Sequence, residues 1–212
     1  MALDGLNPEL EAYLLSWVPP RDPVLQVMEE MAAERDFPII GPLVGPFLTQ
    51  FARLTRAKRI LELGSGFGYS AAWFARGLAP GGQIICTDKS RHNAQLARKF
   101  FAKAGIADRI RFEVGDALVI LDRLPGRFDI ILNDVDKADY PLVLAKAVPR
   151  LRQGGLLVTD NVLWQGQVLT ATSRRGPAHA VREYTRLAYA DPRLLTTILP
   201  IRDGVAVSLK IR

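Results

Sequence analysis

Polar side chains with oxygen ligands recur directly after short apolar segments in this 212-residue chain. Each of five such segments runs into acidic or amide groups, among them Glu62, Asp88, Asp116, Asp134, Asp160 and Asn161. Parallel strands end at a common edge of their sheet, and ligands of open α/β sheets bind outside that edge. The regular placement of these groups therefore predicts one functional site.

Three of these residues could hold a metal ion. Asp134, Asp160 and Asn161 follow two segments that we expect to be neighbouring strands, and two carboxylates with an amide oxygen suit Mg²⁺. Lys137, three residues after Asp134, could act as a general base beside a bound cation. Ordinary caps and turns explain the same acids, and a solvated charge at a helix start explains the lysine, so both interpretations stay open here.

A glycine-rich loop follows the first apolar segment. Gly64, Gly66 and Gly68 would let a ligand approach the backbone, and the helix after them would present free N–H groups. Together with Ala71, the last two glycines also satisfy the dinucleotide-binding pattern, with Asp88 about 20 residues further on. The loop thus predicts a cofactor that contains adenosine, but it does not indicate which one. A plain tight turn is the other interpretation.

The elements that position these residues alternate between two types. Strands are expected at 59–63, 83–87, 109–114, 128–133 and 155–159, with helices at about 70–79, 90–105 and 140–152. Strands that are apolar along their whole length indicate a parallel sheet covered on both faces. Segments 194–199 and 205–211 are joined by only five residues, too few for a parallel crossover. We predict one doubly wound, Rossmann-like α/β domain with a seven-stranded sheet and a C-terminal antiparallel hairpin.

The N-terminal region has helical periodicity. Residues 8–18 and 22–35 are expected to form helices, while Pro and Gly interrupt 36–46 and a short helix is expected at 47–55. We treat residues 1–55 as a helical extension and 56–212 as the main domain.

Composition limits the class of protein. The 49% hydrophobic content supports one sizeable core, no apolar run approaches the ~20 residues of a membrane span, and the N-terminus lacks signal-peptide character. A cytoplasmic protein is expected. The single cysteine, Cys86, excludes an intramolecular disulfide and a cysteine-based zinc cluster. A net charge of +6 suits an anionic partner such as nucleic acid, but the basic residues form no long block.

Four segments together resemble the class I methyltransferases that depend on S-adenosylmethionine and a metal, namely the family of catechol and caffeoyl-coenzyme A O-methyltransferases. They are 62–70 (ELGSGFGYS), 128–140 (FDIILNDVDKADY), 160–168 (DNVLWQGQV) and 200–204 (PIRDG). The resemblance runs in order from about residue 40 to the C-terminus, which makes it specific.

The resemblance implies a role for each matching residue. Asp134, Asp160 and Asn161 would bind Mg²⁺ or a similar ion, Asp134 would also belong to the catalytic and cofactor sites, and Lys137 would accept the proton of the substrate hydroxyl. The cofactor residues would be Glu62, Gly64, Gly66, Tyr69 and Ser70 at the methionine part, Asp88 at the ribose, and Asp116 and Ala117 near the adenine. The implied reaction is methyl transfer to one hydroxyl of a catechol-like diol.

Regions that shape the acceptor pocket in relatives differ here. Residues 37–42 (FPIIGP) replace a different stretch of the plant enzymes, and the segment between Val168 and Asp191 is shorter. A hydroxylated aromatic small molecule is the expected substrate, and a homodimer is expected. The alternatives are methylation of a hydroxyuridine in tRNA, an NAD-dependent oxidoreductase, and a non-catalytic adenosine-binding module.

Overall fold

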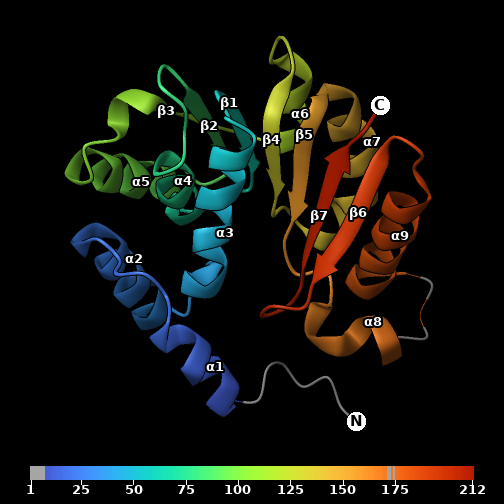
Figure 1. Cartoon of the computed structure of the whole chain (residues 1–212), viewed down its shortest axis with the longest axis horizontal. Helices are drawn as coiled ribbons and strands as arrows, with labels where there is room; N and C mark the ends of the chain where they lie inside the picture. The colour runs from blue at the N-terminus through green and yellow to red at the C-terminus, as the bar shows by residue number, and fades with distance from the viewer. Residues whose placement is uncertain (1–7, 171–172, 174) are drawn as a thin grey trace.

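The computed structural model describes residues 8–170, 173 and 175–212 of the chain. One seven-stranded sheet forms its centre, in the order β3-β2-β1-β4-β5-β7-β6 (Figure 1). The strands are β1 (Arg59–Leu63), β2 (Gln83–Asp88), β3 (Ile110–Val114), β4 (Phe128–Asn133), β5 (Leu151–Thr159), β6 (Leu194–Leu199) and β7 (Val205–Lys210). The first five strands pair in parallel and β7 pairs antiparallel to both neighbours, which confirms the predicted fold.

Helices precede the sheet and alternate with its strands (Figure 1). The α-helices are α1 (Pro8–Ser16), α2 (Pro23–Glu34), α3 (Gly41–Leu54), α4 (Tyr69–Ala75), α5 (Arg91–Lys103), α6 (Ala117–Arg123), α7 (Tyr140–Arg150), α8 (Gln167–Thr170) and α9 (Pro177–Ala190). Short 3-10 helices are η1 (Ala107–Arg109), η2 (Lys137–Asp139) and η3 (Trp164–Gly166).

Both faces of the sheet are covered by apolar helices. Helices α2 to α5 pack on one face, where β1 contributes Ile60 and β4 contributes Leu132. Helices α6, α7 and α9 pack on the other face, which receives Leu61 and Ile131 from the same two strands. Because successive side chains of a strand point to opposite faces, strands buried on both faces must be apolar at every position. This requirement accounts for the uninterrupted apolar segments in the sequence.

The prediction for the N-terminal region was wrong at one element. Only residues 36–40 of the predicted interruption lie outside a helix, since α3 begins at Gly41 and contains both Pro42 and Pro46. Pro42 lies in the first turn, where a helix needs no backbone N–H donor. Gly45 lets α3 pack tightly on α4, because a Cβ at this position would collide with the indole ring of Trp73. Tertiary packing therefore decides the start of this helix.

Two further boundaries differ from the prediction. Helix α4 ends at Ala75 and β5 begins at Leu151, so both elements depart by about four residues from their predicted limits. Helix α9 was not predicted, although Val181, Tyr184 and Ala188 are buried at helical spacing, and the Tyr184 ring packs edge-on against Tyr140 of α7 at 5.6 Å.

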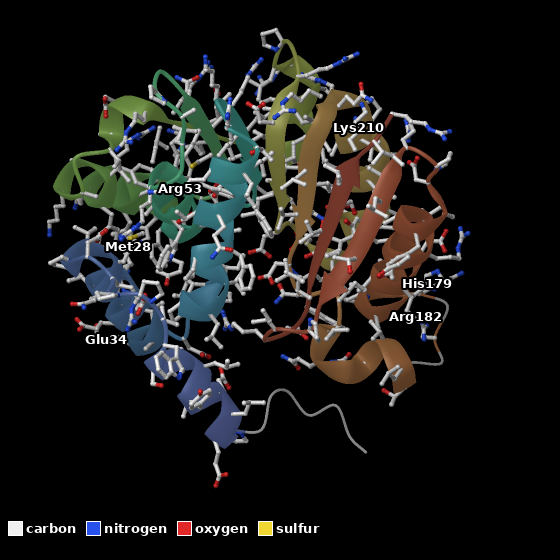
Figure 2. All side chains as sticks on the ribbon, in the orientation of Figure 1. Met28, Glu34, Arg53, His179, Arg182 and Lys210 are labelled. Atoms are coloured by element: carbon white, nitrogen blue, oxygen red, sulfur yellow. The ribbon has the colours of Figure 1, made fainter. Side chains whose placement is uncertain are left out.

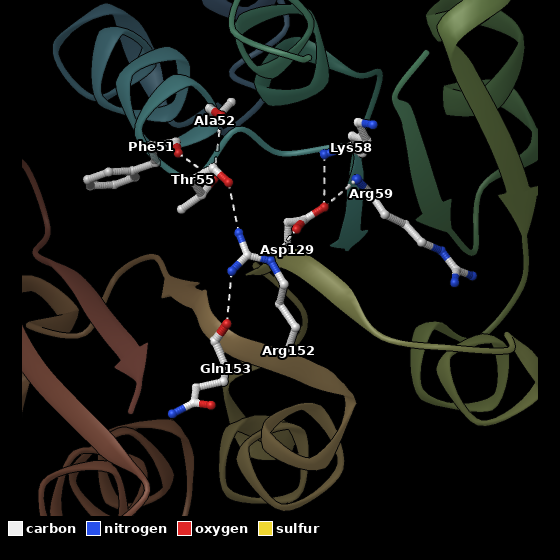
Figure 3. A network of polar contacts seen from close by, with 8 residues as sticks. All are labelled: Phe51, Ala52, Thr55, Lys58, Arg59, Asp129, Arg152 and Gln153. Carbon is white, nitrogen blue, oxygen red and sulfur yellow. Dashed lines mark hydrogen bonds and ion pairs between the residues drawn. The ribbon is translucent and has the colours of Figure 1, made fainter. Parts of the chain in front are cut away.

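A polar network joins the amino ends of the central strands to the end of α3 (Figure 3). The Asp129 carboxylate accepts hydrogen bonds from the backbone N–H groups of Lys58 and Arg59, at 2.8 and 2.7 Å. Arg152 pairs with the same carboxylate and donates to the carbonyl of Thr55 at 2.8 Å. The network lies at the edge of the sheet opposite to the predicted site, so its role is structural.

Lys210, the last residue of β7, is buried although it carries a charge. Lys210, labelled in Figure 2, is 8% exposed, and its ammonium donates to the carbonyls of Val148 and Leu151 at 2.9 and 2.8 Å. Those carbonyls lie at the C-terminal end of α7, where a helix has unpaired acceptors and a partial negative charge. The side chain thus ties the last strand to α7.

Among the described residues, no helix combines the length and apolar character needed to cross a lipid bilayer. The cytoplasmic location and the division at residues 55 and 56 stay predictions. The extension is not separate in packing, because α2 and α3 contribute to the same apolar core as α4 and β1.

Candidate active site

A cavity of about 750 Å³ opens at the carboxyl edge of the parallel strands. Its wall is formed by the loops after β1, β2, β3, β4 and β5, by residues 37–40, and by the turn between β6 and β7. The size lies within the range of small-molecule sites, roughly 300–1,000 Å³. Sites of open α/β sheets lie at this edge, so the sequence pattern located the cavity correctly.

The glycine loop after β1 forms one wall. Gly64 has a left-handed φ of 85°, and a Cβ at this residue would collide with the backbone carbonyl of Asp134. The N–H of Gly66 donates to Asp88 at 3.1 Å, which joins the loop to the end of β2. Asp88 also accepts from the backbone of Ser90 at 2.7 Å. Gly64, Gly66 and Asp88 all line the cavity, as the sequence predicted.

Glu62 lies behind this loop and does not line the cavity. Its carboxyl group is completely buried, with one oxygen within 3.5 Å of the Cys86 thiol and the other without a hydrogen-bond partner in the structure. Burial raises the pKa of Glu62 to about 7, although the nearby hydroxyl groups of Ser65 and Ser70 act in the opposite direction. A fully buried carboxyl with an unpaired oxygen next to a ligand loop is a polar group available to a bound cofactor.

Tyr69 and Ser70 continue the wall at the start of α4. The Tyr69 hydroxyl donates to Glu29 of α2 at 2.7 Å, and Glu29 pairs with Arg21 at 2.9 Å. The N-terminal region is thereby connected to a residue of the cavity wall. Nothing in the local sequence of 21–29 signals this connection, because the partners are 40 residues apart.

At the other end of the cavity, Ala117 lines the wall and Asp116 does not. Asp116 caps α6 instead, since its carboxylate accepts from the N–H groups of Leu118 and Val119 at 3.0 and 3.1 Å. These backbone hydrogen bonds lower the pKa of Asp116. A direct contact of the Asp116 carboxylate with a ligand is therefore not part of this arrangement, while its neighbours Gly115 and Ala117 are accessible from the cavity.

The acidic cluster of the sequence assembles around Lys137. The Lys137 ammonium donates to Asp134 at 3.1 Å and to the side-chain oxygen of Asn161 at 2.8 Å. It is 11% exposed and lies 5.0 Å from the ring centre of Tyr140. Asp160 lines the same part of the cavity and is 7% exposed. All four predicted residues of this group are thus brought together.

The environment of this cluster disfavours the charged form of its two carboxyl groups. Burial raises the pKa of Asp160 to about 7, and the neighbouring charge of Asp134 raises it further, while Lys137 and Arg202 lower it. Burial likewise raises the pKa of Asp134, against the effect of Lys137. A buried carboxyl and a partly exposed one near the same ammonium would be better stabilised by a cation of higher charge.

The donors present fit a hard divalent cation. No group of three His, Cys, Asp or Glu residues suitable for a metal occurs within 8–170, 173 and 175–212, so the amide oxygen of Asn161 has to complete the set. Two carboxylates and one amide oxygen match the ligands that Mg²⁺ takes, with positions left for water or substrate. In this structure the Lys137 ammonium supplies the positive charge among these oxygens.

Gln165 and Arg202 line the cavity and were missed as site residues. Phe37, from the 37–42 stretch expected to shape the acceptor pocket, and Trp164, from the 160–168 segment, line it too. Asn161, Trp164, Gln165 and Arg202 all have left-handed φ values, between 48° and 55°. Non-glycine residues rarely adopt this conformation, and such residues concentrate at functional sites. His92 and His179 do not line the cavity.

Comparisons with known proteins agree with the geometry. A sequence model of the O-methyltransferase family matches residues 21–211. The chain is 33% identical to the caffeoyl-CoA O-methyltransferase of Eucalyptus gunnii, over 96% of this chain and 88% of that protein. It is 32% identical to the catechol O-methyltransferase of Niastella koreensis, over 94% and 96% of the two chains.

Solved structures show the same fold with the cofactor or its product bound. The O-methyltransferase of Bacillus cereus in complex with SAH superimposes with a TM-score of 0.86 at 29% identity, covering 95% of this chain and 97% of that one. The O-methyltransferase TomG of Streptomyces achromogenes in complex with SAM has a TM-score of 0.87 at 28% identity and covers 96% of each chain. The oxidoreductase and tRNA alternatives gain no support from these relatives.

Proposed function

This chain belongs to the O-methyltransferase family, and from that premise we propose that it methylates one hydroxyl of a small aromatic vicinal diol, with a divalent cation at Asp134, Asp160 and Asn161. S-adenosylmethionine (SAM) is the methyl donor. The observation that carries the proposal is the Lys137 ammonium held between Asp134 and Asn161 at the cavity wall.

The cofactor assignments rest on the wall of the cavity. Gly64, Gly66, Tyr69 and Ser70 would surround the methionine part of SAM, and Asp88 would accept hydrogen bonds from the ribose hydroxyls. Glu62 would face the methionine part through its unpaired oxygen. Ala117 would contact the adenine, while Asp116 acts through its cap of α6.

The chain's own residues account for alignment and proton transfer. A divalent cation, when bound, lowers the pKa of a coordinated hydroxyl. Lys137, shielded from solvent and beside these oxygen donors, would accept the hydroxyl proton as the neutral amine, after its ammonium has released one proton to solvent. The acceptor oxygen then forms a bond to the methyl carbon while the carbon–sulfur bond of SAM breaks, which yields the methyl ether and S-adenosylhomocysteine. Holding both reactants in one cavity is the main contribution of the protein.

The test is methyl transfer from labelled SAM to catechol, with Mg²⁺ and with a chelator, in the wild type and in Asp160→Ala. We expect the chelator and the substitution each to abolish transfer. The matched control is Asp136→Ala, which removes a carboxylate from the same cavity wall. The Asp136 side chain is 83% exposed. Loss of Asp160 removes a carboxyl whose burial is costly, so the variant is expected to stay folded.

Direct metal binding separates the site from the reaction. Titration with Mn²⁺, followed by its electron paramagnetic resonance signal, should show one site in the wild type and in Asp136→Ala, and none in Asp160→Ala. Transfer that survives both the chelator and the Asp160 substitution would refute the metal role. The predicted homodimer stays a prediction, although α1 and the residue that follows it expose large aromatic side chains, Tyr13 at 58% and Trp17 at 71%.

A further inference from the structure

Arg202 reaches the cavity from the turn between β6 and β7. The turn is held against the segment that follows β5, because the N–H of Leu163 donates to the Asp203 carbonyl at 2.9 Å. The Asp203 carboxylate also accepts from the N–H of Gln165 at 2.5 Å. Arg202 is therefore presented by a braced turn beside Asp160 and Asn161, and not by a free loop.

The guanidinium of Arg202 has no carboxylate partner within the described part of the chain. Its Nη1 donates to the carbonyl of Ile39 at 2.6 Å, which leaves most of its five N–H donors for another group. The two other cations of the cavity wall are paired, Lys137 with Asp134 at 3.1 Å and Lys89 with Asp116 at 3.6 Å. Arg202 is thus the cation of this wall that forms no ion pair within the described part of the chain, although the carboxylates of Asp134 and Asp160 lie near enough to interact with its charge.

The backbone at Arg202 is in a conformation that disfavours arginine. Its φ is 52°, in the left-handed region that glycine adopts more readily than residues with a Cβ. The chain also makes room for the guanidinium at Gly41, since a Cβ there would collide with Nη1. A strained arginine, accommodated by a glycine from another element, points to a use for the guanidinium itself.

From this geometry we propose that Arg202 binds a carboxylate carried by the methyl acceptor, so that the preferred substrates are aromatic vicinal diols with an acid group. The inference rests on the proposed function and names the substrate class of the same site. A guanidinium matches a carboxylate in two parallel hydrogen bonds. Asp134 and Asp160 repel an acid group at the reacting end, so binding to Arg202 would direct the diol toward Lys137.

The remaining wall suits an aromatic ring between these two ends. Phe37 and Trp164 both line the cavity, and Phe37 is braced by Phe67, with ring centres 5.0 Å apart. Aromatic side chains pack favourably against a flat ring. A substrate that carries a diol, an aromatic ring and a carboxylate therefore matches the kinds of groups that line the cavity.

The test compares binding of 3,4-dihydroxybenzoate and catechol by calorimetry, with Mg²⁺ and S-adenosylhomocysteine present. In Arg202→Gly we expect the affinity ratio of the acid to catechol to fall about 10- to 100-fold, the range for losing a hydrogen-bonded charge pair. Glycine relieves the backbone, so this variant should fold at least as well as the wild type. Arg202→Lys should retain part of the preference, because it keeps the charge without the planar fork.

The matched control is Arg56→Gly, since Arg56 is exposed, has a φ of 49° and lies outside the cavity. An equal change of the ratio in both variants, or no change in Arg202→Gly, would overturn the proposal. Benzoate serves as a second probe that needs no diol. If benzoate binding requires Arg202 but the protein transfers no methyl group to either diol, carboxylate binding by Arg202 is supported. The proposed function is then refuted instead.

Discussion

Replacement of Glu62 by glutamine tests the electrostatics behind the cofactor loop. Glu62 is completely buried, and one of its oxygens has no hydrogen-bond partner in the structure. Burial raises its pKa from the ordinary 4.5 to about 7, so the folded protein holds this proton more tightly than the unfolded chain does. Because each pKa unit corresponds to about 1.4 kcal/mol, the difference amounts to roughly 3 kcal/mol of folding free energy.

The sign follows from which state binds the proton. The stabilising effect of a protonated Glu62 is fully present below pH 4.5 and is lost as the pH rises through about 7. In Glu62→Gln the side chain is neutral at every pH. The free energy of unfolding of the variant, minus that of the wild type, should therefore increase by roughly 3 kcal/mol between pH 4.5 and pH 8.

The measurement is urea denaturation of both proteins at several pH values, without SAM and with a chelator present. Subtraction of the two curves removes the titration of all shared groups. Glu34→Gln is the control, because Glu34 is an exposed carboxylate at the end of α2. If the free energies of unfolding of Glu62→Gln and of the wild type change in parallel between pH 4.5 and pH 8, the buried carboxyl does not retain its proton. The reasoning would then fail.

Two further predictions concern the loop and the opposite edge of the sheet. Gly64→Ala should weaken S-adenosylhomocysteine binding at least about tenfold in calorimetry, because its Cβ would collide with the Asp134 backbone. The control Gly81→Ala, at a residue with a similar positive φ and open space around it, should not weaken binding. Equal losses of affinity in both variants would exclude the collision as the cause. Asp129→Asn should lower the free energy of unfolding by about 2–3 kcal/mol in urea denaturation, because it leaves the Arg152 charge unpaired (Figure 3). The affinity for the cofactor should be retained. An unchanged denaturation midpoint would contradict the structural role of Asp129.

Local sequence was sufficient to predict the sheet and the cluster around Lys137. Strands buried on both faces have to be apolar at every position, so the segments were visible without any long-range information. Parallel strands end at one edge, which brings Asp134 and Asp160 together although they are distant in the chain. Asp88 and the glycine loop followed from the same rule, and the hydrogen bond from Gly66 to Asp88 confirms their proximity.

Local rules were insufficient where packing opposes them. Pro42 and Pro46 indicate a break, yet α3 contains both: Pro42 lies in the first turn, which tolerates proline, while Pro46 lies further inside, next to Gly45, which allows close contact with Trp73. Helix α9 is held by contacts such as that of Tyr184 with Tyr140, 44 residues away in the chain. Asp116 followed the motif in position, but its carboxylate is used by the cap of α6.

By itself, the sequence determined the class of fold, the edge at which ligands bind and the oxygen donors gathered there, because these depend on apolar patterning and on strand direction. Only the tertiary structure decided which groups face those donors across the cavity. Arg202 and Phe37 are 165 positions apart, and the pairing of β6 with β7 and of the turn with Leu163 places both on one wall. Such proximity is created by packing between elements, for which no local pattern in the chain is a signal.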